Sequence, residues 1–108
     1  MISVEKIKDI LSLYAKFGWK LESVLLTSKL SKQIGDSIMN LFDSIEVIES
    51  EINAVWFTRT SGKDRTAWEL RRLSETPYAL CEVFENTTEE SLCEEKRREM
   101  IRQMKAKT

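Results

Sequence analysis

The middle of the chain reads, from residue 54 to residue 84, AVWFTRT (54–60), SGKDR (61–65), TAWELRRL (66–73), SETP (74–77) and YALCEVF (78–84). Aromatic and β-branched residues dominate the first, third and fifth segments, which is typical of β-strands. Turn-forming residues fill the two short segments between them. This stretch therefore predicts three antiparallel strands joined by two tight turns, and it is the part of the chain around which the fold is organised.

The two turns differ in how well they define the strand register. Gly62 supplies the positive φ that a tight hairpin needs, so a five-residue loop over 61–65 places Trp56 opposite Leu70. At the second turn two registers remain open. One continues the face of Leu70 with Leu80, and the other continues that face with Cys81 and Val83.

The third predicted strand, 78–84, is apolar on both faces. Strands of this kind are usually covered on both sides, so we expect this one to lie inside the sheet rather than at its edge. Leu70 and Leu80 occupy central places in the second and third strands. We expect both side chains to lie in the core.

A further strand is predicted over 19–26, in the sequence WKLESVLL. Simple alternation of its side chains places Trp19, Leu21 and Leu25 on one face, with Val24 on the other. The mixture of apolar residues on both faces indicates a sheet that is covered on both sides, at least at the far end of this strand.

Helices are predicted on both sides of the strands in the chain. Apolar residues recur at helical spacing over 4–17 and 29–42, and Thr87 and Glu90 have the spacing of a capping box that begins a last helix reaching Lys105. The segment 43–53 fits either a short extended piece or a turn of helix, and we expect an irregular segment that could include one short strand. The prediction is a single α+β domain over 1–108, with the order α-β-α-β-β-β-α and a mostly antiparallel sheet covered mainly on one face by helices.

Composition limits the classes of function. The chain has 17 basic and 18 acidic residues and a formal net charge of −1, so it lacks the basic excess typical of proteins that bind nucleic acid. It contains no histidine, the commonest general base, and only two cysteines, Cys81 and Cys93, which are too few for a zinc site or a disulfide framework. We expect two reduced thiols, no metal, no cofactor, no membrane span and a cytoplasmic location.

A small set of polar and aromatic residues on the predicted strands forms the only candidate ligand site. These residues are Trp56, Arg59, Trp68, Glu69 and Arg71. Such side chains could bind a small molecule or carry out carboxylate chemistry, but charged pairs on the wet face of a sheet explain them equally well.

The last predicted helix carries Met100, Ile101 and Met104, whose adaptable side chains suit either a partner surface or the sheet of their own domain. The absence of a catalytic motif favours a non-catalytic interaction or accessory module, working as a homodimer or with another protein. The alternative is a small-ligand binder or enzyme that uses the Arg, Glu and Trp residues of the sheet.

Overall fold

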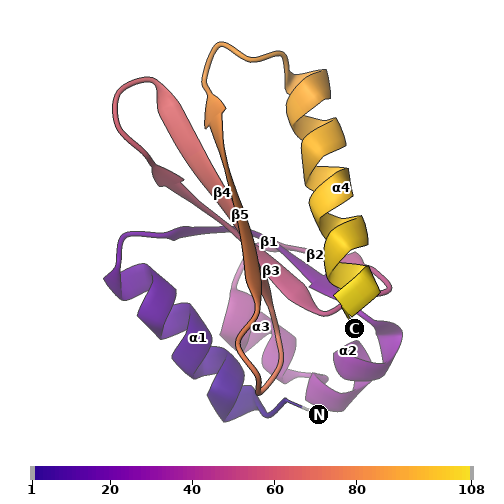
Figure 1. Cartoon of the computed structure of the whole chain (residues 1–108). Coiled ribbons are helices and arrows are strands. Elements are labelled where there is room, and N and C mark those ends of the chain that lie inside the picture. Colours follow the sequence, from indigo (N-terminus) through magenta and orange to yellow (C-terminus); the bar gives the residue numbers. More distant parts are fainter. Residues whose placement is uncertain (1, 108) are drawn as a thin grey trace.

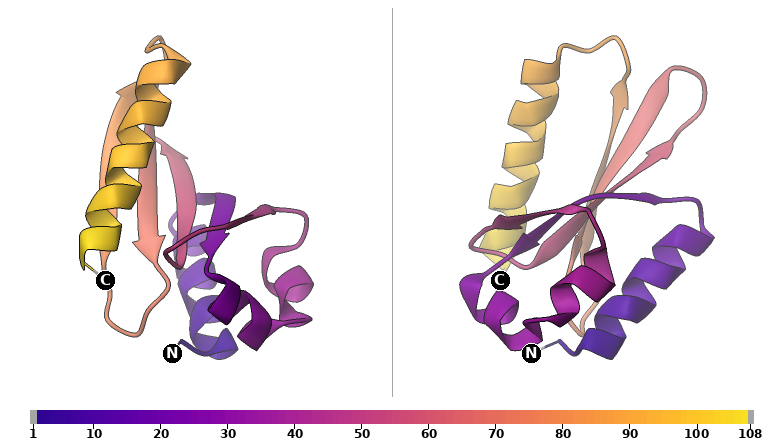
Figure 2. Two further views of the ribbon diagram at one scale, coloured as in Figure 1. Left: turned by 90° about the vertical axis from the view of Figure 1, so that its right-hand side faces the viewer. Right: turned by 180° about the vertical axis from the view of Figure 1, so that it is seen from behind.

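The computed structural model describes residues 2–107 and confirms an α+β fold with a mostly antiparallel sheet (Figure 1). The helices lie on both sides of that sheet, with three on one face and one on the other (Figure 2). The elements in chain order are α1 (Val4–Lys16), β1 (Lys20–Leu26), α2 (Ser28–Ile34), α3 (Ser37–Phe42), β2 (Glu46–Glu49), β3 (Ala54–Thr60), β4 (Arg65–Arg72), β5 (Ala79–Glu85) and α4 (Glu90–Lys107).

The five strands lie in the order β2-β1-β3-β4-β5, with β1 and β2 parallel and every other pair antiparallel. The expectation that β5 lies inside the sheet is wrong, because β5 is an edge strand. The additional interior strand is β1, which pairs with β3 on one side and with β2 on the other. Val24, Leu25 and Leu26 are all buried, so β1 occupies the interior position that was expected for β5.

The register predicted for the first hairpin is confirmed. Trp56 faces Leu70 across β3 and β4, and Gly62 has a φ of 78° in the turn between them. The second hairpin adopts the first of the two open registers, in which Leu70 faces Leu80. Leu70 is fully buried and Leu80 is half-buried, so the core prediction holds completely for Leu70 and partly for Leu80.

A β-bulge changes the faces of β1. Leu21 pairs with Phe57 and Ser23 pairs with Trp56, so Glu22 is one residue more than the partner strand supplies. This extra residue reverses the alternation, and Leu21 packs with Val24 on the same side of the sheet. The prediction that Leu21 shares a face with Leu25 is therefore wrong, because that prediction assumed unbroken pairing.

The helix predicted over 29–42 is two short helices, α2 and α3. Gly35 ends α2 with φ 47° and ψ −120°, a backbone conformation that side chains with a Cβ rarely adopt. The chain changes direction there, which lets Leu30 and Ile34 of α2 and Phe42 of α3 all reach the same core.

The last helix begins at Glu90, three residues after the predicted cap. The backbone before Glu90 instead forms hydrogen bonds at the open end of the β4–β5 hairpin. The N–H of Asn86 donates to the carbonyl of Asp64 at 2.8 Å, and the N–H of Thr88 donates to the carbonyl of Glu85 at 3.0 Å. Among the helices within residues 2–107, none is both long enough and apolar enough to cross a membrane.

Two hydrophobic cores lie on opposite faces of the sheet. The larger core packs the sheet against α1, α2 and α3, and its fully buried members are Ile7, Val24, Leu26, Leu30, Phe42, Val55 and Phe57. The smaller core packs the sheet against α4, and it contains Leu25, Ile52, Ala54, Trp56, Leu70, Met100 and Met104. Because side chains alternate along a strand, β1 and β3 contribute to both cores.

Replacing Leu70 by alanine should test the smaller core. The side chain is fully buried, so Leu70→Ala should lower the free energy of unfolding by about 2 to 5 kcal/mol, the usual cost of removing a buried leucine side chain. Leu80→Ala should cost less, because Leu80 is only half-buried. Urea unfolding followed by tryptophan fluorescence measures both changes.

The matched control is Leu92→Ala on α4, where the side chain is 56% exposed. This change should cost less than about 0.5 kcal/mol, as is usual for exposed positions. A cost at Leu70 no larger than the cost at Leu92 would reject the placement of Leu70 in the smaller core.

Candidate functional site

The sheet separates the five residues of the predicted ligand site. Trp56 and Trp68 point towards α4, with ring centroids 5.8 Å apart, whereas Arg59, Glu69 and Arg71 lie on the opposite face, which α1 covers. Their numbering explains the division, because odd and even residues of paired strands point to different faces. The five side chains therefore do not line one pocket.

On the α4 face the tryptophans are structural. Trp56 is 5% exposed, and Trp68 lies between the ring of Trp56 and the guanidinium of Arg97, whose Cζ is 4.4 Å from the centroid of the Trp68 ring. Arg97 also pairs with Glu90 at 2.6 Å. The cation–π contact holds the first turns of α4 against β4, and the ion pair lies within α4.

On the α1 face the centre of the cluster is Tyr14, which the sequence analysis did not single out. Its ring stacks on Phe57 with centroids 4.1 Å apart and planes 9° from parallel, and its hydroxyl donates a hydrogen bond to the carboxylate of Glu69. Burial raises the pKa of Tyr14 well above its usual value, and the bond to Glu69 raises it further. The signal was available, since a tyrosine on the apolar stripe of a helix needs a partner for its hydroxyl.

The two arginines of this face are held by contacts within the domain. The Cζ of Arg59 lies 4.5 Å from the centroid of the Trp19 ring, and its Nη1 donates to the carbonyl oxygen of Phe17 at 2.9 Å. Arg71 is 7% exposed, and its guanidinium donates to the carbonyl oxygen of Arg72. The Arg59 contacts tie the C-terminal turn of α1 to the sheet, whereas the Arg71 bond lies within β4.

The two cysteines lie on opposite faces of the sheet, so they cannot approach each other. Cys81 is exposed on the α1 face, and Cys93, a residue of α4, is buried on the other face. Partial burial raises the pKa of Cys81, and the neighbouring carboxylate of Glu69 raises it further, so its thiolate is disfavoured. Within residues 2–107 no three His, Cys, Asp or Glu side chains are grouped closely enough to hold a metal ion.

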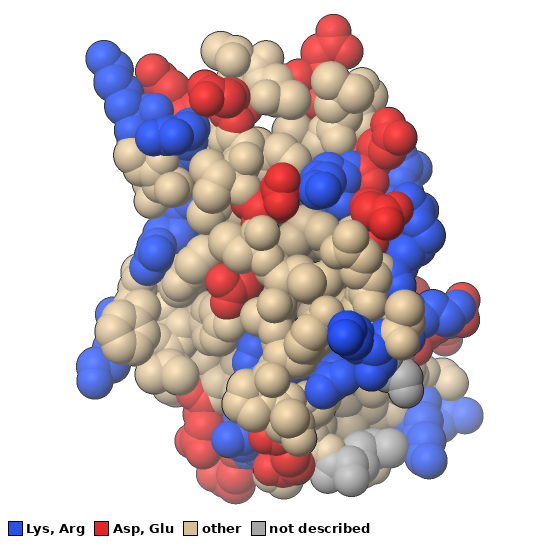
Figure 3. All heavy atoms as spheres, in the orientation of Figure 1, with Lys and Arg blue, Asp and Glu red and all other residues tan. Residues whose placement is uncertain are grey.

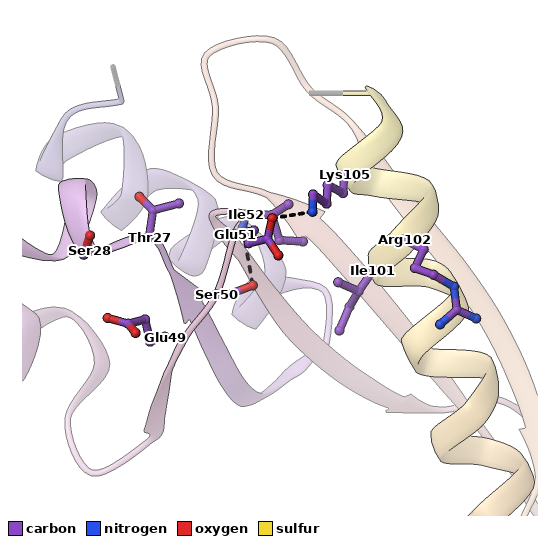
Figure 4. Close-up of a pocket in the computed structure, with 9 residues that line it drawn as sticks. All are labelled: Thr27, Ser28, Glu49, Ser50, Glu51, Ile52, Ile101, Arg102 and Lys105. Atoms are coloured by element: carbon purple, nitrogen blue, oxygen red, sulfur yellow. Dashed lines mark hydrogen bonds and ion pairs between the residues drawn. The ribbon is translucent and has the colours of Figure 1, made fainter.

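A hollow of about 810 Å³ lies between the start of α2, the β2–β3 connection and the end of α4 (Figure 4). It is wide open, and its polar groups do not converge. Lys105 bonds to Glu51 across it, whereas Glu49 and Arg102 lie on opposite sides and point away from each other. A small-molecule site needs polar groups directed at one point, and this hollow does not provide them.

The methionines of the predicted interface belong to the core. Met100 is 2% exposed and Met104 is fully buried, both against Trp56 and Leu70, while Ile101 is half-buried beside the hollow. Their burial removes the reason for placing an interface on these three residues, because a partner cannot reach the two methionines without unfolding α4.

The outer edge of β5 is a different kind of surface. Beyond the two ends of the β4–β5 ladder, Arg72 N–H donates to the Tyr78 carbonyl at 2.9 Å and Asn86 N–H donates to the Asp64 carbonyl at 2.8 Å. Both bonds join even-numbered residues, and the register between them is regular. Because bonded and non-bonded pairs alternate along an antiparallel ladder, the odd-numbered residues of β5 direct their N–H and C=O groups away from β4. These are Ala79, Cys81, Val83 and Glu85.

The side chains of the same four residues are also exposed. Tyr14 lies over β3 and β4, and α4 packs on Trp68 and Leu70, so neither helix covers the α1-side face of β5. Val83 is 47% exposed, and on the same side of the sheet α1 exposes Leu13 and Phe17. Figure 3 shows a mainly uncharged area in the middle of this view, over β4 and β5, which a few acidic groups interrupt and further charged groups surround. We call Ala79, Cys81 and Val83, together with the outward backbone groups of β5, the β5 margin.

Comparison of this chain with protein families, with curated proteins and with solved structures finds no match. The function of the protein is therefore inferred from the geometry of the molecule alone.

Replacing Tyr14 by phenylalanine should test the bond to Glu69. The change removes a hydrogen bond to a charged group in a half-buried site, so it should lower the free energy of unfolding by about 1 kcal/mol at neutral pH. The pKa of Tyr14 is raised in the folded state, so its contribution is complete below the unfolded pKa of 10.0 and is lost as the pH rises above that value. The stability difference between wild type and Tyr14→Phe should therefore shrink above pH 10.0.

Tyr78→Phe is the matched control, since it removes the same hydroxyl from the opposite face of the sheet. This variant should keep the loss of stability above pH 10.0 that the wild type shows. Denaturant unfolding at several pH values measures all three proteins. A pH-independent difference between wild type and Tyr14→Phe would show that the hydroxyl is not bonded to the carboxylate.

Proposed function

We propose that this protein is a non-catalytic interaction module that binds another polypeptide strand along the β5 margin. The observation that carries the proposal is the outward row of N–H and C=O groups on Ala79, Cys81, Val83 and Glu85. An exposed strand edge is a template for a further strand, and main-chain hydrogen bonds supply affinity without a specialised pocket. The expected place of action is the cytoplasm.

The contrast with the other edge of the sheet supports this choice. β2 has four residues and carries Glu46 and Glu49 at its ends, so it is short and acidic. Both features normally protect an edge from pairing. β5 has seven residues, and three of its four exposed side chains, those of Ala79, Cys81 and Val83, are uncharged, whereas the fourth, Glu85, lies at its end. The two edges therefore differ in the way expected if β5 is the binding strand.

The charged cluster of the α1 face supports an interaction role better than catalysis. Glu69 is occupied by Tyr14, Arg59 contacts Trp19, and Arg71 is buried. Among the described side chains, no buried nitrogen or oxygen atom lacks a hydrogen-bond partner. Groups that are already paired position the sheet and α1, and they hold the β5 margin in place.

Photochemical cross-linking in the cells that make the protein tests this function. A photoreactive phenylalanine derivative in place of Ala79 should give a discrete adduct with one polypeptide, because this exposed side chain borders the binding edge. The same derivative in place of Glu95, exposed on α4, should give none. Combining the Ala79 probe with Val83→Pro, which removes an outward N–H, should abolish the adduct.

A probe at Ala79 that forms no protein adduct, or one that is unaffected by Val83→Pro, would contradict binding along β5. Native mass spectrometry of the same preparation gives a second measurement. A bound small molecule, in place of a bound chain, would favour the ligand-binding alternative.

A further inference from the structure

We propose that the strand received by the β5 margin is β5 of a second copy of the same chain, so that two five-stranded sheets join edge to edge about a two-fold axis. This inference rests on the proposed function and names its partner. Two copies related by a two-fold axis present the same strand to each other in antiparallel directions, which is the pairing that an antiparallel edge extends most directly.

The outward residues restrict the registers that two copies can form. Only odd-numbered residues of β5 have free N–H and C=O groups, so hydrogen-bonded pairs must join odd residues to odd residues. Three of these registers keep at least five residues of each β5 paired, with the two-fold axis at a pair of Cys81 residues, a pair of Val83 residues, or a pair of Glu82 residues between bonded pairs. Each register brings different side chains face to face.

Charge and polarity favour the register centred on Cys81. In the register centred on Glu82, two carboxylates face each other directly, which destabilises strand pairing. In the register centred on Val83, Glu82 faces Phe84 and Glu85 faces Cys81, so no aromatic pair forms across the two strands.

With Cys81 at the axis, small and apolar side chains match. Ala79 faces Val83 of the second copy on the α1 side, and Tyr78 faces Phe84 on the α4 side. Aromatic pairs and pairs with β-branched residues are the favourable kinds of cross-strand contact. Each Glu82 then faces Leu80, and Glu85 lies opposite Pro77, so no like charges are directly opposed.

The neighbouring elements leave room for this approach. On one face Tyr14 stacks over Phe57 of β3 and bonds to Glu69 of β4, which places α1 inward of β5. On the other face Met100 and Met104 pack on Trp56 and Leu70, which places the second half of α4 over β3 and β4. The paired sheet would have ten strands with the acidic β2 at both outer edges, so assembly stops at two copies.

Sedimentation equilibrium of the full chain across micromolar concentrations tests the partner. The wild type should show the mass of two chains at the upper concentrations. Val83→Pro should raise the dissociation constant of the dimer by about tenfold or more, because it removes one outward hydrogen bond and places a ring against the incoming strand. Its N–H points away from β4, so the fold should remain, which circular dichroism checks. Val83→Thr keeps the N–H and the β-branched shape and should still form the dimer.

Thiol cross-linking tests the register independently. Mild oxidation at about pH 9, chosen because the Cys81 thiol has a raised pKa, should join two chains through Cys81, which peptide mapping identifies. The double variant Cys81→Ser, Val83→Cys should cross-link at least about tenfold more slowly, since position 83, which is also exposed, faces Ala79 of the second copy.

The outcomes separate this inference from the proposed function. A monomer at every concentration, together with an Ala79 adduct to a different protein, would overturn self-pairing and leave the interaction module standing. A monomer with no protein adduct would overturn both. A dimer that Val83→Pro leaves intact, or one that cross-links faster through position 83 than through Cys81, would overturn the proposed pairing of β5 with itself.

Discussion

The alternation of side chains along β4 is the constraint on which the other contacts depend. Trp68 and Leu70 point towards α4, whereas Ala67 and Glu69 point towards α1. β4 is paired on both sides, with β3 and with β5, so a shift by one residue would exchange the two faces along the whole strand. Fully buried Leu70 lies between Trp56 and Leu80, and its position links both hairpins to the smaller core.

This alternation decides what the polar residues can do. Glu69 lies beside the ring of Tyr14 and accepts the hydrogen bond from its hydroxyl, while Arg59 spans from β3 to the Trp19 ring and the carbonyl of Phe17. Each charged group thus satisfies a partner that folding has partly removed from water. A chain with helices on both faces of a sheet uses its polar residues to attach those helices. The uncovered backbone along β5 remains as the surface that can contact another molecule.

The two edge strands of the sheet, β2 and β5, differ in how their exposed backbone is protected. β2 is a short strand that runs parallel to β1, and the carboxylates at its ends protect its exposed edge from pairing with another strand. β5 is longer, and its outward residues other than Glu85 carry small or apolar side chains. An unprotected edge is a hazard for a protein that acts alone, and it is a natural surface for a protein that acts with a partner.

The sequence by itself determined the elements whose signals are local: the three strands after residue 54, the first hairpin with Trp56 opposite Leu70, and the helix that contains Tyr14. Turn chemistry and side-chain periodicity depend on residues only a few positions apart, so they can be read without the fold. The tertiary structure alone decided the order of the strands, which puts β5 at the edge, and the bulge at Glu22, which reverses the faces of β1. It also decided that Met100 and Met104 are core residues and that the sheet separates the predicted ligand residues. Pairing between distant segments and the choice of which face a helix covers depend on contacts across the whole chain, and no short stretch of sequence contains them.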